Sequence, residues 1–175
     1  MSHPEQLEFV ASVRQRFPGF FTGRRVLEVG SLDINGSVRG MFTDCDYVGV
    51  DVAPGRGVDV VAQGQALDYD DASFDVAISC ECFEHNPFWL ETFVNMRRMA
   101  SALVVFTCAT EGRHEHGTSR TSPSDSPLTV GIGWEYYRNL TAADFEDALP
   151  LADLFTAYEF LVNDSTHDLY FVGVV

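Results

Sequence analysis

The chain has 175 residues, of which 46% are apolar and 21% charged, a balance typical of one folded domain rather than a disordered or membrane-spanning chain. Eleven basic against 26 acidic residues give a net charge of −15, which disfavours binding to nucleic acid or an anionic membrane. No apolar run reaches the roughly 20 residues of a membrane span, and residues 1–10 do not resemble an export signal. We therefore expect a single cytoplasmic domain over residues 1–175, whose oligomeric state the sequence leaves open.

The first half of the chain predicts one helix followed by short buried strands. Within residues 1–20, apolar side chains recur at helical spacing from Pro4 to Phe17, with Ser2 as the N-cap, and Pro18-Gly19 ends the helix. Short apolar runs then predict four strands, at 26–30, 47–52, 58–62 and 74–79.

The second half alternates helix and strand and closes on a hairpin. Helices are predicted at 87–100 and at 141–149, where Thr141 and Asp144 resemble a capping box, and a strand is predicted between them at 102–107. The last strands are predicted at 154–162 and 168–175. This order predicts an α/β fold: a doubly wound, mostly parallel sheet of about seven strands, with a C-terminal antiparallel hairpin and helices on both faces.

Two connections have unusual lengths. Only residues 53–57 separate the second and third strands, so we expect no helix between Val52 and Val58. Residues 111–138 form a long polar stretch rich in Gly, Ser and Thr, and such segments are often functional. Because it follows the fifth strand, it is predicted to lie on the substrate side and cover the pocket.

Polar and glycine residues follow the predicted strands where a doubly wound sheet binds its ligands. The first strand leads into Glu28-Val29-Gly30-Ser31-Leu32, the second ends on Asp51, and the fourth continues through Cys80 to Glu84-His85. Together these segments resemble the motifs of class I, Rossmann-like S-adenosylmethionine-dependent methyltransferases of the small-molecule type. The order of the segments agrees with that family over nearly the whole chain, although Leu32 and Ile34 replace two glycines of its first loop.

The resemblance implies S-adenosylmethionine as cofactor and a small molecule as the methyl acceptor. Asp51 matches the acidic residue that accepts hydrogen bonds from the ribose hydroxyls, and Gln63 stands where the family usually has an acidic adenine ligand. The cofactor-binding residues implied in this way are Glu28, Gly30, Ser31, Leu32, Asn35, Asp51, Val52, Gln63, Gly64 and Cys80.

His85 is the candidate catalytic residue, because an imidazole beside the methyl group can act as a general base. The alternative is a histidine that caps the turn, since methyl transfer depends more on alignment and exclusion of water than on a base. Candidate substrate-binding residues in the long polar segment are His114, His116, Trp134, Tyr137 and Arg138. The aromatic members of this set have a structural alternative as anchors of the segment.

The sequence favours no metal site. His114 and His116 point to opposite sides of an extended backbone, and the four cysteines lack the spacing of zinc ligands. Asn86-Pro87-Phe88-Trp89 resembles a signature of nitrogen methylation but follows the strand too late, which leaves oxygen slightly favoured as the acceptor.

Two other functions remain open. The altered glycine loop and Gln63 suit an inactive S-adenosylmethionine-binding module that acts through a protein partner. Asp51 also suits a nicotinamide-dependent reductase, although the chain contains no lysine for the Tyr-Lys pair that such enzymes use.

Overall fold

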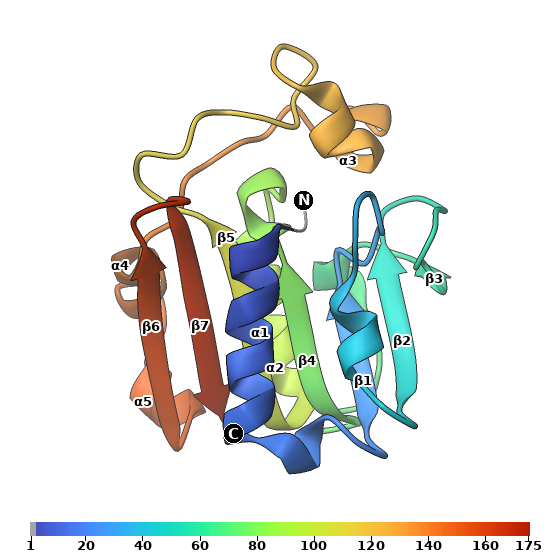
Figure 1. Ribbon diagram of the computed structural model, residues 1–175, viewed down its shortest axis with the longest axis vertical. Coiled ribbons are helices and arrows are strands. Elements are labelled where there is room, and N and C mark those ends of the chain that lie inside the picture. Colours follow the sequence, from blue (N-terminus) through green and yellow to red (C-terminus); the bar gives the residue numbers. More distant parts are fainter. Residues whose placement is uncertain (1–2) are drawn as a thin grey trace.

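The computed structural model describes residues 3–175, which form one sheet with helices on both of its faces (Figure 1). The strand order is β3-β2-β1-β4-β5-β7-β6, with β7 antiparallel to both of its neighbours and all other pairs parallel. The strands are β1 (Arg25–Val29), β2 (Asp46–Asp51), β3 (Val60–Val61), β4 (Phe74–Cys80), β5 (Ala100–Ala109), β6 (Ala157–Asn163) and β7 (Asp168–Val174). The predicted seven-stranded sheet and its terminal hairpin are confirmed.

Helix α1 (Pro4–Arg16) covers one face of the sheet. Its apolar side chains Phe9, Val10 and Val13 are buried in a cluster that also includes residues of β1, β4, β5 and β7. The predicted N-cap, Ser2, lies outside the described residues. The N-cap is His3, whose Nδ1 lies 3.4 Å from the Gln6 amide nitrogen and 3.1 Å from Glu5 Oε2.

Helix α2 (Trp89–Met99) covers the opposite face, together with α4 (Ala142–Glu146) and α5 (Leu151–Leu154). Phe93 of α2 is fully buried among Phe83, Phe106, Phe145 and Phe171. Burial of this many aromatic rings provides a large share of the hydrophobic stabilisation.

The capping box of Thr141 and Asp144 is confirmed, but two predicted elements near it have wrong limits. Helix α4 ends at Glu146 rather than at residue 149, and β6 begins at Ala157 rather than at residue 154, which belongs to α5. Leu151 and Phe155 are buried on either side of an exposed pair, and a segment this short does not distinguish helix from strand by its pattern.

Connections between the first strands contain only single 3₁₀ turns within the described residues. These are η2 (Val38–Met41) and η3 (Gly64–Ala66), and η1 (Pro18–Phe20) follows α1. No helix lies between Val52 and Val58, as predicted. None of the helices formed by residues 3–175 combines the length and apolar character needed to cross a bilayer.

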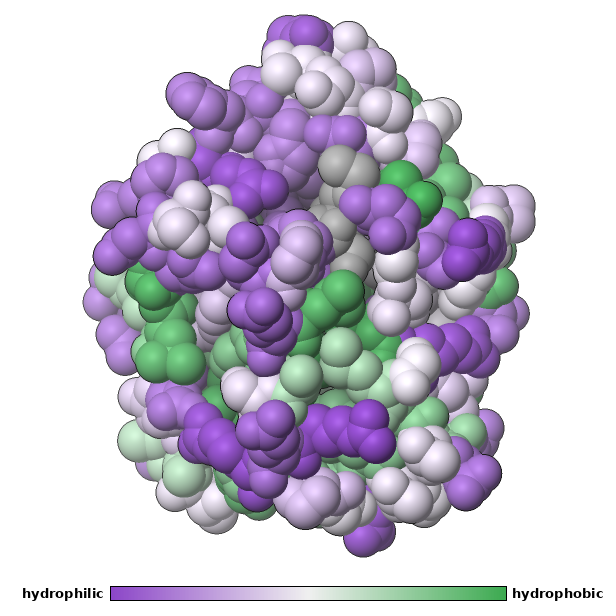
Figure 2. Space-filling model, in the orientation of Figure 1, coloured by the Kyte–Doolittle hydropathy of each residue, from purple (hydrophilic) through white to green (hydrophobic). Residues whose placement is uncertain are grey.

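Residues 111–138, here called the cap segment, lie above the carboxyl ends of the parallel strands (Figure 1). The segment is not entirely irregular, because it contains η5 (Pro123–Asp125) and α3 (Pro127–Gly131). Figure 2 shows that its exposed surface is largely hydrophilic, whereas apolar side chains lie exposed over β6, among them Leu161 and Val162. The cap segment therefore covers the edge of the sheet at which Gly30 and Asp51 stand.

Candidate functional site

A pocket lies between the strand ends and the cap segment. The carboxyl ends of β1, β2 and β4 form its floor, because these three strands are neighbours and parallel. The cap segment contributes residues 125–129 to its wall. Among the residues predicted from the sequence, the lining includes Glu28, Gly30, Ser31, Leu32, Asp51, Cys80 and His85.

The loop after β1 packs tightly on its surroundings. Gly30 has a φ of +81°, and a β-carbon at this position would lie 2.5 Å from the Cys82 β-carbon. Only glycine adopts this conformation at low cost while allowing such close contact. Gly30 is therefore required by the backbone and by Cys82.

The short connection after β2 packs against the same loop. A β-carbon on Gly57 would lie 2.6 Å from the Ser31 carbonyl oxygen, and Arg56 forms an ion pair of 2.8 Å with Asp33. The Asp33 amide also donates to the Arg56 carbonyl at 2.8 Å. These contacts show how the chain passes from β2 to β3 without a crossover helix.

Asp51 ends β2 with its carboxylate turned toward the glycine loop. One oxygen accepts from the Leu32 amide at 3.0 Å and the other from the Val52 amide at 2.8 Å. A carboxylate has about four acceptor positions, so capacity for two further hydrogen bonds remains. Burial raises the pKa of Asp51, although both amide donors oppose the shift.

Five buried side chains in the pocket lining, Glu81 and His85 among them, have polar atoms without a hydrogen-bond partner in the protein, and three of these side chains lie by the glycine loop and α1. The unpartnered atoms of these three are the side-chain amide of Gln6, Oε2 of Glu28 and the hydroxyl of Ser31. Burial raises the pKa of Glu28 to about 7, against the opposing effects of Tyr47 and Arg39. Because buried polar groups are nearly always paired, these atoms are available to a polar ligand or to ordered water in the pocket.

Gln6 lines the pocket although the sequence pattern did not predict it there. It shares the helical spacing of Phe9, Val10 and Val13, and it is as fully buried as they are. A polar residue on the apolar face of the helix was the available signal.

Four predicted cofactor residues lie outside the described pocket lining. Asn35 is exposed between the lining residues Ile34 and Gly36, and Val52 directly follows Asp51. Gln63 accepts a hydrogen bond from Gln65, and a β-carbon on Gly64 would lie 2.6 Å from Thr92 of α2. The close packing of η3 on α2 therefore requires Gly64.

The turn η4 (Phe83–His85) follows β4 and places Glu84 and His85 beneath the cap segment. The Arg138 backbone amide donates to the Glu84 carbonyl oxygen at 2.9 Å, which joins the last residue of the cap segment to η4. Burial raises the pKa of Glu84, and nearby Glu81 raises it further. Burial and the neighbouring His116 lower the pKa of His85 to about 3, so its ring is neutral at pH 7.

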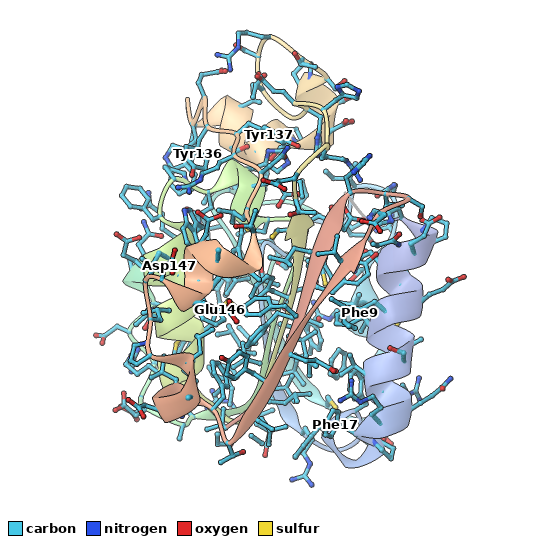
Figure 3. The ribbon with its side chains drawn as sticks, turned by 90° about the vertical axis from the view of Figure 1, so that its left-hand side faces the viewer. Phe9, Phe17, Tyr136, Tyr137, Glu146 and Asp147 are labelled. Carbon is cyan, nitrogen blue, oxygen red and sulfur yellow. The ribbon has the colours of Figure 1, made fainter. Side chains whose placement is uncertain are left out.

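The predicted substrate residues divide into two groups. His114 and His116 line a second pocket in the cap segment, and Tyr137 donates to the His114 carbonyl at 3.1 Å. Figure 3 shows Tyr137 in the part of the cap segment nearest the sheet, and its ring lies 5.0 Å from that of His116.

The other two predicted substrate residues have structural contacts. Trp134 packs edge-on against Phe88, with ring centroids 5.7 Å apart. Arg138 pairs with Asp144, and its guanidinium lies 5.8 Å from the Trp89 ring. These contacts agree with the alternative in which part of this set anchors the cap segment.

Asn86 also has a structural role, at the start of α2. Its side chain donates to the Thr92 hydroxyl at 2.9 Å and accepts from the Phe88 amide at 2.8 Å. These bonds use both ends of the Asn86 amide, which therefore holds the backbone at the start of α2.

A buried ion-pair cluster lies beside the pocket. The His3 Nε2 atom is 3.0 Å from Asp168 and 3.8 Å from Glu81, and Arg113 lies 3.1 Å from Asp168. Burial lowers the pKa of His3, but Asp168 and Glu81 outweigh this effect and raise it to about 10. The protonated His3 thus links α1 to β7.

No protein-family model and no curated protein sequence matches the chain. Solved structures match it over most of its length. The CurJ carbon methyltransferase superposes with a TM-score of 0.63 and 13% identity, covering 97% of this chain and 53% of that one. The N-terminal domain of EvdMO1, solved in the presence of SAH and D-fucose, gives 0.62 and 18%, covering 100% and 84%.

A [4+2]-cyclase, SpnF, is also similar, with a TM-score of 0.57 and 17% identity over 89% of this chain and 58% of that one. The chain therefore spans little more than half the length of CurJ and SpnF. At these identities the similarity concerns the fold, which supports several activities. The chain has the Rossmann-like fold of the class I S-adenosylmethionine-dependent methyltransferases.

Proposed function

We propose that the chain is a cytoplasmic S-adenosylmethionine-dependent methyltransferase that modifies a small molecule, with oxygen favoured as the acceptor atom. One observation carries this proposal: Asp51 and the unpartnered polar atoms of Gln6, Glu28 and Ser31 meet in one pocket over the glycine loop. Similar folds solved as a methyltransferase and with S-adenosylhomocysteine support it.

The pocket residues fit the chemical groups of this cofactor. The two free acceptor positions of Asp51 suit the two hydroxyls of a ribose. Glu28 supplies an acceptor for an ammonium group, and Gln6 and Ser31 supply donors for a carboxylate. The backbone at Gly30 would lie beneath the part of the cofactor that joins these groups.

When bound, the cofactor supplies a methyl group on a sulfonium sulfur. An acceptor hydroxyl that took this methyl group would release its proton to water, because the buried His85 is too weak a base to hold it at pH 7. The chain aligns the reactants and excludes water by means of residues 125–129 of the cap segment. His85 forms part of the pocket wall, and its low pKa favours a positioning role over that of a general base.

An inactive cofactor-binding module that acts through a protein partner is the second candidate. It is favoured by Leu32 and Ile34 in place of loop glycines, and by the occurrence of this fold in a cyclase. Both candidates predict cofactor binding, and only the first predicts methyl transfer.

A thermal-shift measurement tests the cofactor assignment. Because a ligand that binds only the folded state stabilises it, S-adenosylhomocysteine should raise the melting temperature, and NAD⁺ should not. A rise with NAD⁺ and none with S-adenosylhomocysteine would show instead that the pocket serves a nicotinamide enzyme.

A further inference from the structure

Three side chains that can ligate a metal converge beneath the cap segment. Glu84 and His85 belong to η4, and His116 belongs to the cap segment. One donor atom from each lies within 4.8 Å of the other two, and the rings of His85 and His116 are 4.9 Å apart, nearly perpendicular. Two imidazoles and a carboxylate thus lie close enough to contact one ion, although His116 is 31 positions beyond His85 in the chain.

All three side chains are buried, and the atoms with which they could ligate a metal have no hydrogen-bond partner in the protein. The exposed fractions are 0% for Glu84, 2% for His85 and 9% for His116. Both Glu84 oxygens, both His85 ring nitrogens and Nε2 of His116 are unpartnered in the protein. Burial of a single polar group without a partner costs about 1–3 kcal/mol, so three such groups together call for a bound ligand.

His116 is held in the form that a metal ligand requires. Its Nδ1 lies 3.0 Å from the His114 carbonyl oxygen, which can only accept a hydrogen bond. This contact places the proton on Nδ1 and leaves the Nε2 lone pair free. Tyr137 donates to the same carbonyl and so helps fix its position.

The nearby cations of the protein are already engaged. Arg113 donates to Asp168 and to the Thr166 carbonyl, and Arg138 pairs with Asp144. The sequence contains no lysine. The adjacent group of His3, Glu81 and Asp168 differs in this respect, because His3 and Arg113 provide its positive charge.

We propose that Glu84, His85 and His116 bind one divalent first-row transition metal ion, with Zn²⁺ as the representative ion. Imidazole and carboxylate are ordinary zinc ligands, and three protein ligands leave a fourth position open. Ligand atoms about 2.1 Å from a tetrahedral ion are roughly 3.4 Å apart, so the ion would draw Glu84 Oε1 and His85 Nε2 together from 3.9 Å.

The open position would lie where the two pockets meet. His85 lines the first pocket, and His116 lines the second. If the proposed methyl transfer is correct, an oxygen of the acceptor would occupy this position, which assigns the substrate to small molecules that bear a hydroxyl or carboxylate group. Metal binding itself does not depend on the proposed function.

Calorimetric titration of the chelator-treated chain with Zn²⁺ tests the site. We expect one ion per chain with a Kd of about 1 μM or tighter, and a rise in melting temperature with Zn²⁺. His116→Ala and Glu84→Gln should each weaken binding at least about 10-fold, a loss typical of damaged metal sites. The control is His114→Ala, which removes an exposed imidazole two residues away and keeps the carbonyl that orients His116.

The variants are compared only where circular dichroism shows a native fold, and two independent ligand variants guard against loss of one through misfolding. Absence of stoichiometric binding by the unmodified chain, or equal affinity in all variants, would overturn the site. S-adenosylhomocysteine is titrated in parallel. Zinc binding without cofactor binding would reject only the proposed function, and the reverse would reject only the metal site.

Discussion

The imidazole Nε2 of His3 lies 3.0 Å from Asp168 Oδ2, joining the N-cap of α1 to the first residue of β7. Arg113 of the cap segment forms an ion pair with the same carboxylate. One buried acidic side chain thus connects the N-terminal helix, the C-terminal strand and the segment that covers the pocket.

This pair predicts a pH-dependent stability. Because the folded-state pKa of His3 is raised from 6.5 to about 10, its contribution is fully present below pH 6.5 and is lost as the pH rises toward 10. His3→Asn supplies a side-chain oxygen that can cap the helix and removes the charge. Denaturant unfolding should therefore show a variant less stable than the wild type at pH 6.5 and nearly equal to it at pH 10. A difference that does not change with pH would show that the ion pair contributes nothing.

Gly30 and Cys82 provide a second prediction. Gly30→Ala combines a positive φ with a contact of 2.5 Å, and we expect a loss of about 2 kcal/mol or more in the free energy of unfolding. Adding Cys82→Gly removes the clash and leaves the backbone strain, so the double variant should cost less than the two single changes summed. Additive losses in urea unfolding would mean that the two residues do not interact.

Most of the fold could be predicted from the sequence because its buried strands are short apolar runs that end at turns. The predictions were wrong where a helix of one turn precedes a strand, as at residues 151–154, and where a polar stretch contains short helices, as in the cap segment. Helices of four or five residues carry too little periodicity to be recognised locally.

The site was predictable only where its residues follow strands. Glu28, Gly30 and Asp51 belong to such positions, whereas Gln6 reaches the pocket from a helix that precedes the sheet. The approach of His116 to His85 depends on the path of the cap segment, which no local pattern specifies. The prediction that His114 and His116 point to opposite sides of the backbone agrees with their environments, since the His116 side chain is buried and that of His114 is exposed.

The cap segment should control how fast the ligand leaves. Replacing residues 119–133 by a short glycine linker removes the pocket wall at 125–129 and retains His116 and Tyr137. We expect S-adenosylhomocysteine to dissociate at least several-fold faster from this variant, because a barrier to exchange has been removed. Stopped-flow competition measures this rate, and circular dichroism checks the fold. An unchanged rate in a folded variant would exclude a gating role.

Calorimetric titration of S-adenosylhomocysteine into the wild type, Asp51→Ala and Asp153→Asn tests the central claim most directly. Asp153 is an exposed carboxylate on α5 and serves as the matched control. We predict one binding site in the wild type and the control, and a loss of about 1–3 kcal/mol in Asp51→Ala, since unpaired ribose hydroxyls would remain in a buried site. Equal affinity in all three proteins, or no binding by the wild type, would contradict the assignment of this pocket to S-adenosylmethionine.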